Sequence, residues 1–238
     1  MDPTTLYILM TAMVLSGAGL GIVLKLQNNV KVDDVSFKHP FFQCLTMFVG
    51  ESLCIWIYLI EKMQLKKKYG SVESSPGMVK AKEDGLKTKI NPLLFAIPML
   101  CDATASSLLL IAYINIPASI AQMMGGFVVF VVAIFSIIFL GRRFFRHHWF
   151  GLVLIFSGIS LVAASALVEK GDEDDQQGNA TLGVLIMVAS IMVQGCQYIV
   201  EEKLLSSYYL SPMKAVGWEG IHGTILFVIL LPIFQFIP

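Results

Sequence analysis

The sequence predicts an all-α membrane protein. Seven apolar stretches, each about twenty residues long, take up most of its 238 residues. A bilayer has a hydrocarbon core about 30 Å thick, which a helix of roughly 20 apolar residues can cross. Runs of this length without alternation fit helices rather than the strands of a barrel. The composition agrees: 14% of the residues are charged, against about 25% in an average soluble domain.

The predicted spans follow one another along the whole chain. The first begins near the N-terminus, has no basic segment before it and is too long for a signal peptide, so we expect it to remain as an anchor. The spans run from Leu6 to Leu26, Phe41 to Ile60, Pro92 to Ile114, Pro117 to Leu140, Trp149 to Val168, Leu182 to Val200 and Met213 to Ile237.

The basic residues predict the orientation. Connections after the second, fourth and sixth spans hold 13 of the 17 Lys and Arg residues, and the other connections hold 4. By the positive-inside rule, the first group faces the cytosol. The N-terminus is then cytosolic, and Pro238 lies on the far side.

Two connections are long. The cytosolic one, residues 61–91, mixes Lys with Ser, Gly and Pro, as flexible solvated loops do, and we expect disorder there. The far-side one, residues 169–181, is acidic and contains the glycosylation sequon Asn179-Ala180-Thr181. The sequon lies close to the sixth span, where a transferase has poor access.

No motif predicts catalysis, a cofactor or a nucleic-acid partner. The chain has no CxxC or HxxxH spacing, so neither a disulfide framework nor a metal site is expected. It also has no phosphate-binding glycine loop and no nucleophile with a base at a workable spacing, so an intramembrane enzyme is disfavoured. The four cysteines all fall within spans: Cys44, Cys54, Cys101 and Cys196.

Three ionisable residues lie deep within spans. Glu51, Asp102 and Glu219 each stand where insertion of a charge costs about 2.5–3.5 kcal/mol. Such groups usually face a bundle interior or a water-filled cavity, so we expect them to bind a substrate. The alternative is that they form hydrogen bonds between helices and bind nothing. Three amides within spans extend the candidate substrate-binding set: Gln122, Gln194 and Gln197.

Acidic residues also stand at the end of the sixth span. Glu201 and Glu202, followed by Lys203, lie where solvation is easy. We interpret them first as the boundary of the span and second as a gate.

Motifs from the third span onward resemble a known group of transporters. The runs Cys101-Asp102-Ala103-Thr104-Ala105-Ser106-Ser107-Leu108 and Pro117-Ala118-Ser119-Ile120-Ala121-Gln122-Met123-Met124-Gly125-Gly126 are similar to the drug/metabolite transporter superfamily. So are Asn91-Pro92-Leu93-Leu94-Phe95, Phe139-Leu140-Gly141-Arg142-Arg143 and Trp149-Phe150-Gly151. Glu201-Glu202-Lys203 and Pro212-Met213-Lys214-Ala215-Val216-Gly217-Trp218-Glu219-Gly220 resemble the solute carrier 35 family within it. The resemblance covers nearly the whole chain except the two long connections.

The resemblance implies a fold of ten helices in two inverted five-helix repeats, with both termini cytosolic and a central substrate cavity. Residues 1–168 would form the first repeat and residues 182–238 the first two helices of the second. Glu51 and Glu219 would then lie on corresponding helices. The sequence departs from the family by ending after the seventh span, so we expect a fragment or a shortened version, whose transport activity alone is in doubt.

The family resemblance implies a multi-pass secondary transporter of a small metabolite, with nucleotide sugars as a substrate class. It would work by alternating access between the cytosol and an organelle lumen. The residues favour another solute, because a diphosphate needs Arg or Lys in the cavity and the nearest cations, Lys25 and Lys203, lie at span ends. The first alternative is a cation- or proton-coupled carrier that uses the membrane carboxylates. The second is a non-transporting membrane adaptor whose polar groups bind the helices of a partner.

The expected partners are the lipid bilayer and a small-molecule substrate. The sequence leaves a homodimer or a membrane-protein partner open. The family points to a Golgi, endosomal or lysosomal membrane, with a mitochondrial membrane as the alternative.

Overall fold

The computed structural model describes residues 3–29, 31–32, 35–36, 39–88, 90–168 and 180–236. Within these ranges the chain is almost entirely helical, apart from a hairpin in which β1 (Lys31–Val32) pairs antiparallel with β2 (Val35–Ser36). Seven segments are long and apolar enough to cross a bilayer. This confirms the predicted all-α membrane fold. The segments are Thr4–Val23, Pro40–Tyr69, Pro92–Asn115, Ser119–Leu140, Arg146–Ser165, Thr181–Ser207 and Pro212–Ile233.

The first two spans are built from three helices. The first is α1 (Pro3–Asn29), and the second joins α2 (Pro40–Ser52) to α3 (Cys54–Tyr69) through Leu53. Leu53 keeps a helical backbone conformation, and its N–H donates to the Gly50 carbonyl at 3.2 Å. The second span is therefore one nearly continuous rod, with a local break two residues after Glu51.

The prediction of a flexible loop over residues 61–91 is wrong for much of this segment. Residues 61–69 continue α3, because Glu, Lys, Met, Gln and Leu all favour helix. The helix ends at Gly70, whose φ of 75° suits a residue without a side chain. A further helix, α4 (Pro76–Glu83), begins with a proline in its first turn and is followed by Gly85 at φ 73°.

The third and fourth spans are each interrupted. The third consists of the 3₁₀ turn η1 (Pro92–Phe95) and α5 (Ala96–Asn115), and it is capped by the Asn91 side chain, which accepts from the Leu93 N–H at 3.1 Å. The fourth consists of α6 (Ala118–Gly125) and α7 (Phe127–Leu140), which meet at Gly126.

The remaining spans are single helices: α8 (Arg146–Val168), α9 (Ala180–Ser207) and α10 (Pro212–Phe236). The sixth span is longer than predicted, because α9 continues past Glu201 to Ser207. Most of the predicted acidic loop, with Asn179 of the sequon, lies outside the described residues.

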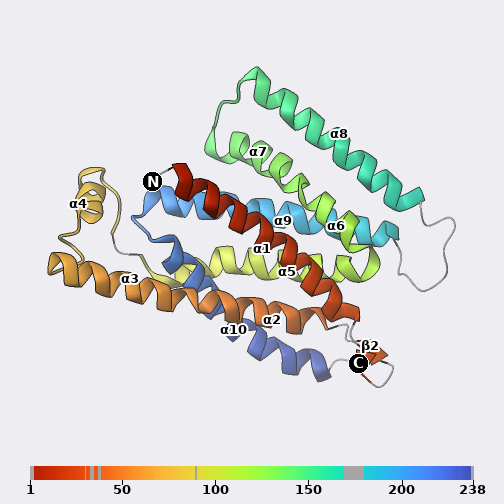
Figure 1. The fold of residues 1–238 in the computed structure, drawn as a ribbon, viewed down its shortest axis with the longest axis horizontal. Helices are drawn as coiled ribbons and strands as arrows, with labels where there is room; N and C mark the ends of the chain where they lie inside the picture. Colours follow the sequence, from red (N-terminus) through yellow and green to blue (C-terminus); the bar gives the residue numbers. More distant parts are fainter. Residues whose placement is uncertain are drawn as a thin grey trace.

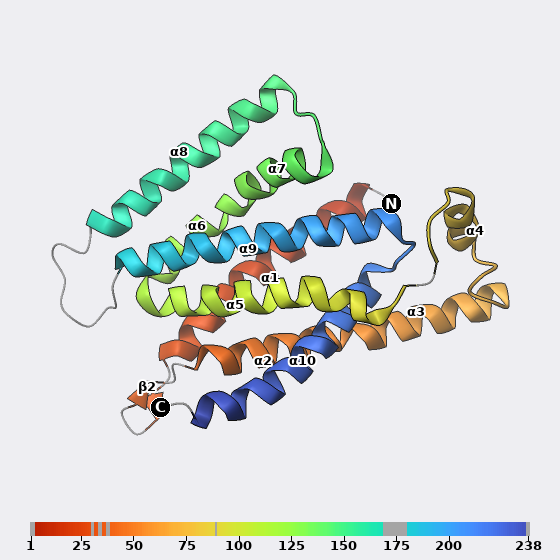
Figure 2. The same ribbon diagram turned by 180° about the vertical axis from the view of Figure 1, so that it is seen from behind.

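The bundle is organised around two pairs of helices whose members run in opposite chain directions (Figure 1). In Figures 1 and 2, α5 runs along α9, while α10 runs along α2 and α3. The helix α7 packs on α9, and α8 forms the outer edge beyond α6 and α7. Figure 1 shows α1 crossing in front of α5 and α9.

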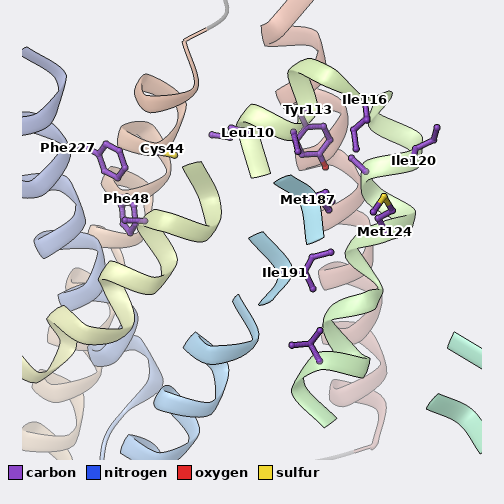
Figure 3. Packing of buried hydrophobic residues seen from close by; sticks show 14 of the residues in the cluster. Cys44, Phe48, Leu110, Tyr113, Ile116, Ile120, Met124, Met187, Ile191 and Phe227 are labelled. Carbon is purple, nitrogen blue, oxygen red and sulfur yellow. The ribbon is translucent and has the colours of Figure 1, made fainter. Parts of the chain in front are cut away.

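The apolar core has two parts, which Figure 3 shows on either side of Leu110. In one part, Phe48 of α2 stacks on Phe227 of α10 with ring centroids 5.5 Å apart. The other part joins α5, α6 and α9 through Tyr113, Ile116, Ile120, Met124, Met187 and Ile191.

The outer helices expose apolar side chains. Leu15 on α1 and Leu161 on α8 are 69% and 73% exposed, and most of their neighbours on these helices are exposed as well. In a membrane such surfaces contact lipid chains, which are as apolar as leucine. Polar residues on the inner helices are therefore the ones that need a functional explanation.

Candidate functional site

Four carboxylates from four helices lie inside the bundle. Glu51 belongs to α2, Asp102 to α5, Glu201 to α9 and Glu219 to α10. Asp102 and Glu219 are buried, with 9% and 6% of their surface exposed, and the other two are half-buried. Glu219 lies close enough to each of the other three carboxylates for their charges to interact. We call these four residues the acidic cluster.

Close contact between two helices places Glu219 beside Glu51. A Cβ at Gly220 would lie 2.6 Å from the carbonyl carbon of Glu51 and 2.8 Å from its Cβ. A Cβ at Gly217 would lie 2.7 Å from the backbone nitrogen of Ile55. Only glycine allows α10 to approach α2 and α3 this closely. The glycines on both sides of Glu219 therefore hold this carboxylate inside the bundle.

Hydrogen bonds orient two of the four carboxylates. Ser106 Oγ donates to Asp102 Oδ1 at 3.1 Å, and Gln197 Nε2 donates to Glu201 Oε1 at 2.8 Å. In the described part of the chain, no hydrogen bond or ion pair reaches the carboxylate of Glu51 or that of Glu219. A buried carboxylate without a partner is costly, unless it takes up a proton or a cation.

No basic side chain among the described residues forms an ion pair with the four carboxylates. Across the described ranges, the ion pair that forms joins Arg142 to Glu202, on the outside of the bundle. The same ranges contain no group of three His, Cys, Asp or Glu side chains close enough to hold a metal ion.

Two predicted site residues lie elsewhere. Gln122 and Gln194 line a cavity of about 390 Å³ between α1, α5, α6 and α9. The cavity is also lined by Tyr113, Ser190 and the backbone of Gly21, where a Cβ would overlap the Gln122 amide. Its remaining lining residues are Gly17, Ala18, Leu20, Leu109, Ala121, Gly125, Met187 and Ile191. Among the lining residues that the structure describes, none is Lys or Arg.

A polar stripe on α9 connects the cavity with the acidic cluster. Ser190, Gln194, Gln197 and Glu201 follow one another at intervals of four, three and four residues, which places them on one face of the helix. Ser190 Oγ donates to the carbonyl of Ala105 on α5 at 2.7 Å. The Gln197 amide oxygen is buried and accepts no hydrogen bond from the described residues.

Glu201 was not among the predicted site residues. The sequence interpretation placed it at a span boundary, but α9 continues for six more residues, and the half-buried Glu201 carboxylate accepts a hydrogen bond from Gln197. The neighbouring Glu202 does face outwards and pairs with Arg142. Glu201 follows Gln197 by four residues, which places both on one face of the helix. This spacing could have distinguished Glu201 from Glu202 in the sequence.

Comparison with known proteins identifies the family. The family described as "Nucleotide-sugar transporter" matches residues 2–213. The chain belongs to this family. That result confirms the group that the motifs around Asp102, Gln122 and Glu219 indicated.

Several relatives within and near this family are similar to the chain. Solute carrier family 35 member F6 of Homo sapiens is 32% identical over 204 residues, which cover 85% of the chain and 52% of the relative. The same protein of Mus musculus is also 32% identical, with the same coverage. The UDP-galactose translocator of Mus musculus is 28% identical over 137 residues, or 58% of the chain and 35% of the translocator. The chain thus spans about half the length of the solute carrier relatives.

Proposed function

We propose that the chain forms part of a secondary transporter that carries a small polar metabolite across an intracellular membrane. The observation that carries this proposal is the cavity at Gln122 and Gln194, whose described lining holds four polar side chains and no charged one, together with the α9 stripe that leads from it to the acidic cluster. Transporters of this type hold their solute near the middle of the bilayer, between two repeats that rock against each other. Residues 1–168 and 182–238 would contribute to the first and second repeats. The N-terminus would face the cytosol.

The cavity supports a carrier over an adaptor. An adaptor would use its buried polar groups to contact a partner, so they would pack dry against neighbouring helices. Here the amides of Gln122 and Gln194 border open space, and Gln122 is itself exposed. Such a space can accept a solute of modest size through hydrogen bonds.

Nucleotide sugars are the first candidate substrates, since the family and the name of the UDP-galactose translocator both point to them. A diphosphate needs charge-assisted hydrogen bonds from Arg or Lys. The lining of the cavity offers amides and hydroxyls instead. A nucleotide sugar would therefore need a cation from elsewhere in the transporter.

The acidic cluster favours a second candidate, a proton-coupled carrier of an uncharged or cationic solute. Four carboxylates without a basic partner can exchange protons as the site opens to either side. Glu51 and Glu219 are the first candidates for this exchange, because no hydrogen bond or ion pair from the described residues holds either carboxylate.

Uptake into liposomes tests both candidates. The transporter is reconstituted, and uptake of radiolabelled UDP-galactose and of unphosphorylated solutes is measured with and without a proton gradient. Proton coupling predicts that a gradient accelerates uptake, and that Glu51→Gln and Glu219→Gln abolish this acceleration. Glu202→Gln is the matched control, because its carboxylate lies outside the cluster. Nucleotide-sugar exchange that is unchanged in both cluster variants would refute the proton-coupled candidate.

The location of the transporter is a separate proposal. We expect a Golgi, endosomal or lysosomal membrane, with mitochondria as the alternative. Imaging of a tagged protein beside organelle markers decides between them, and a plasma-membrane signal alone would contradict the proposal.

A further inference from the structure

A contact between α4 and the connection from α9 to α10 closes one end of the bundle. The Lys87 N–H donates to the Ser207 carbonyl at 3.3 Å, and the Tyr209 N–H donates to the Lys87 carbonyl at 3.0 Å. These two bonds make a parallel β-bridge between Lys87 and Tyr208. Residues 76–87 and 208–211 together are called the clasp below.

Side chains reinforce the clasp on both sides of the bridge. The Lys87 ammonium lies 5.7 Å from the centre of the Tyr208 ring, within the range of a cation–π contact. The Tyr209 hydroxyl rests against Gly77 in the first turn of α4, where a Cβ would overlap it. Ser211 Oγ donates to Glu61 Oε2 of α3 at 3.2 Å. The segment that the sequence predicted to be a flexible loop is thus bound to the bundle.

The clasp connects the two parts of the chain that would move against each other. In the proposed function, α3 and α4 belong to the first repeat, while α9 and α10 belong to the second. Rocking of the repeats has to separate them at one end while it closes the other. A backbone hydrogen bond needs its nitrogen and oxygen about 3 Å apart, so the bridge cannot survive such a separation. The clasp has to release whenever this end of the transporter opens.

We propose that the clasp is a latch that holds the cytosolic end of the transporter closed. The inference rests on the alternating access of the proposed function and on the predicted cytosolic position of the basic connections. The latch lies at the end of the bundle nearest to the acidic cluster, since Glu201 is six residues from the end of α9 and Glu219 is seven residues from the start of α10. Release of the latch would therefore expose the acidic cluster to the cytosol.

Cross-linking tests whether the contact exists in a membrane. Neighbouring strands lie about 4.8 Å apart, within the range of Cα separations, about 4.4–6.8 Å, that a disulfide spans. The double variant Lys87→Cys with Tyr208→Cys is oxidised in liposomes, and free thiols are counted by mass spectrometry after unfolding. We expect two fewer free thiols than in the unoxidised protein, and no loss in either single variant. Failure of the double variant to cross-link would overturn the proposal.

Thiol labelling tests whether the contact acts as a latch. Ser106→Cys places a thiol beside Asp102, and its rate of reaction with a water-soluble reagent from the cytosolic side reports opening. In this background, Gly77→Leu forces the Tyr209 hydroxyl away from α4, whereas Val79→Leu, on an exposed position of the same helix, serves as the control. We expect Gly77→Leu to raise the labelling rate about fivefold. This is the change in the population of the open state when the closed state loses stabilisation equal to one hydrogen bond. The control should leave the rate unchanged.

The outcomes separate the latch from the proposed function. An unchanged labelling rate in Gly77→Leu would overturn the latch, whatever the transport assays show. A cross-linked protein that still transports would also overturn it, because a latch held shut should stop the cycle. Absence of uptake in the unmodified protein would refute the proposed function, while the labelling rates would still report whether the clasp controls access.

Discussion

Replacing Gly220 by alanine tests the close contact between α10 and α2 that positions Glu219. The new Cβ would lie 2.3 Å from the backbone nitrogen of Ser52 and 2.6 Å from the carbonyl carbon of Glu51, whereas ordinary contacts begin at 3.4 Å. The two helices would have to move apart by the larger difference, 1.1 Å. Adding a methyl group to a tightly packed interface costs about 1–3 kcal/mol. Gly220→Ala should therefore destabilise the protein.

Gly50→Ala provides the matched control, because a Cβ at Gly50 meets nothing within 4 Å. Both glycines are helical, so both variants gain about 0.5–1 kcal/mol of helix propensity. The difference between their Tm values then isolates the packing cost. At about 2–4 °C per kcal/mol for a chain of this size, we expect Gly220→Ala to melt about 2–12 °C below Gly50→Ala.

Thermal unfolding in detergent, followed with a thiol-reactive dye, measures both Tm values. Of the four free cysteines, Cys44 is buried, so its thiol becomes reactive on unfolding. Equal Tm values for the two variants would refute the close approach of α10 to α2. The placement of Glu219 beside Glu51 would then lose its support.

Three further predictions concern other polar contacts. Ser190→Ala removes the bond to the Ala105 carbonyl and should cost about 1 kcal/mol, read as a lower denaturation midpoint; no change would contradict this bond. Gln122→Ala removes an amide from the cavity, so it should raise the KM for the transported solute with little change in Tm. An unaltered KM would show that the solute binds elsewhere. Arg142→Ala breaks an exposed ion pair with Glu202 and should change the free energy of unfolding by less than about 1 kcal/mol; a larger loss would show that the pair is structural.

The spans could be predicted from the sequence because length and apolar composition determine what crosses a bilayer. Their ends were less accurate. The second span continues to Tyr69 and the sixth to Ser207, since a helix does not stop where hydrophobic residues stop. Residues 61–69 and 201–207 remain helical because they favour helix and because other elements contact them.

The sequence predicted only part of the way in which these polar residues are arranged. Charge within a span identified Glu51, Asp102 and Glu219, and the structure places these three around one interior. It also separates Gln122 and Gln194 from them, in a cavity that none of the three carboxylates lines. Composition alone could not show this division, because the division depends on which helix faces pack together.

The clasp could not be predicted, because its parts are far apart in the sequence. Lys87 and Tyr208 are brought together by the fold, and the bonds between them involve backbone atoms that any sequence possesses. The composition of residues 61–91 resembles that of a flexible loop. What orders this segment is its contact with the connection from α9 to α10.

The central claim is that the acidic cluster faces a hydrated interior rather than lipid. A cryo-EM map of the transporter in a lipid nanodisc tests it directly. We expect water or solute density between Glu51, Asp102 and Glu219, and acyl-chain density against Leu161 on the outer face of α8. Acyl-chain density against the three carboxylates would contradict the account.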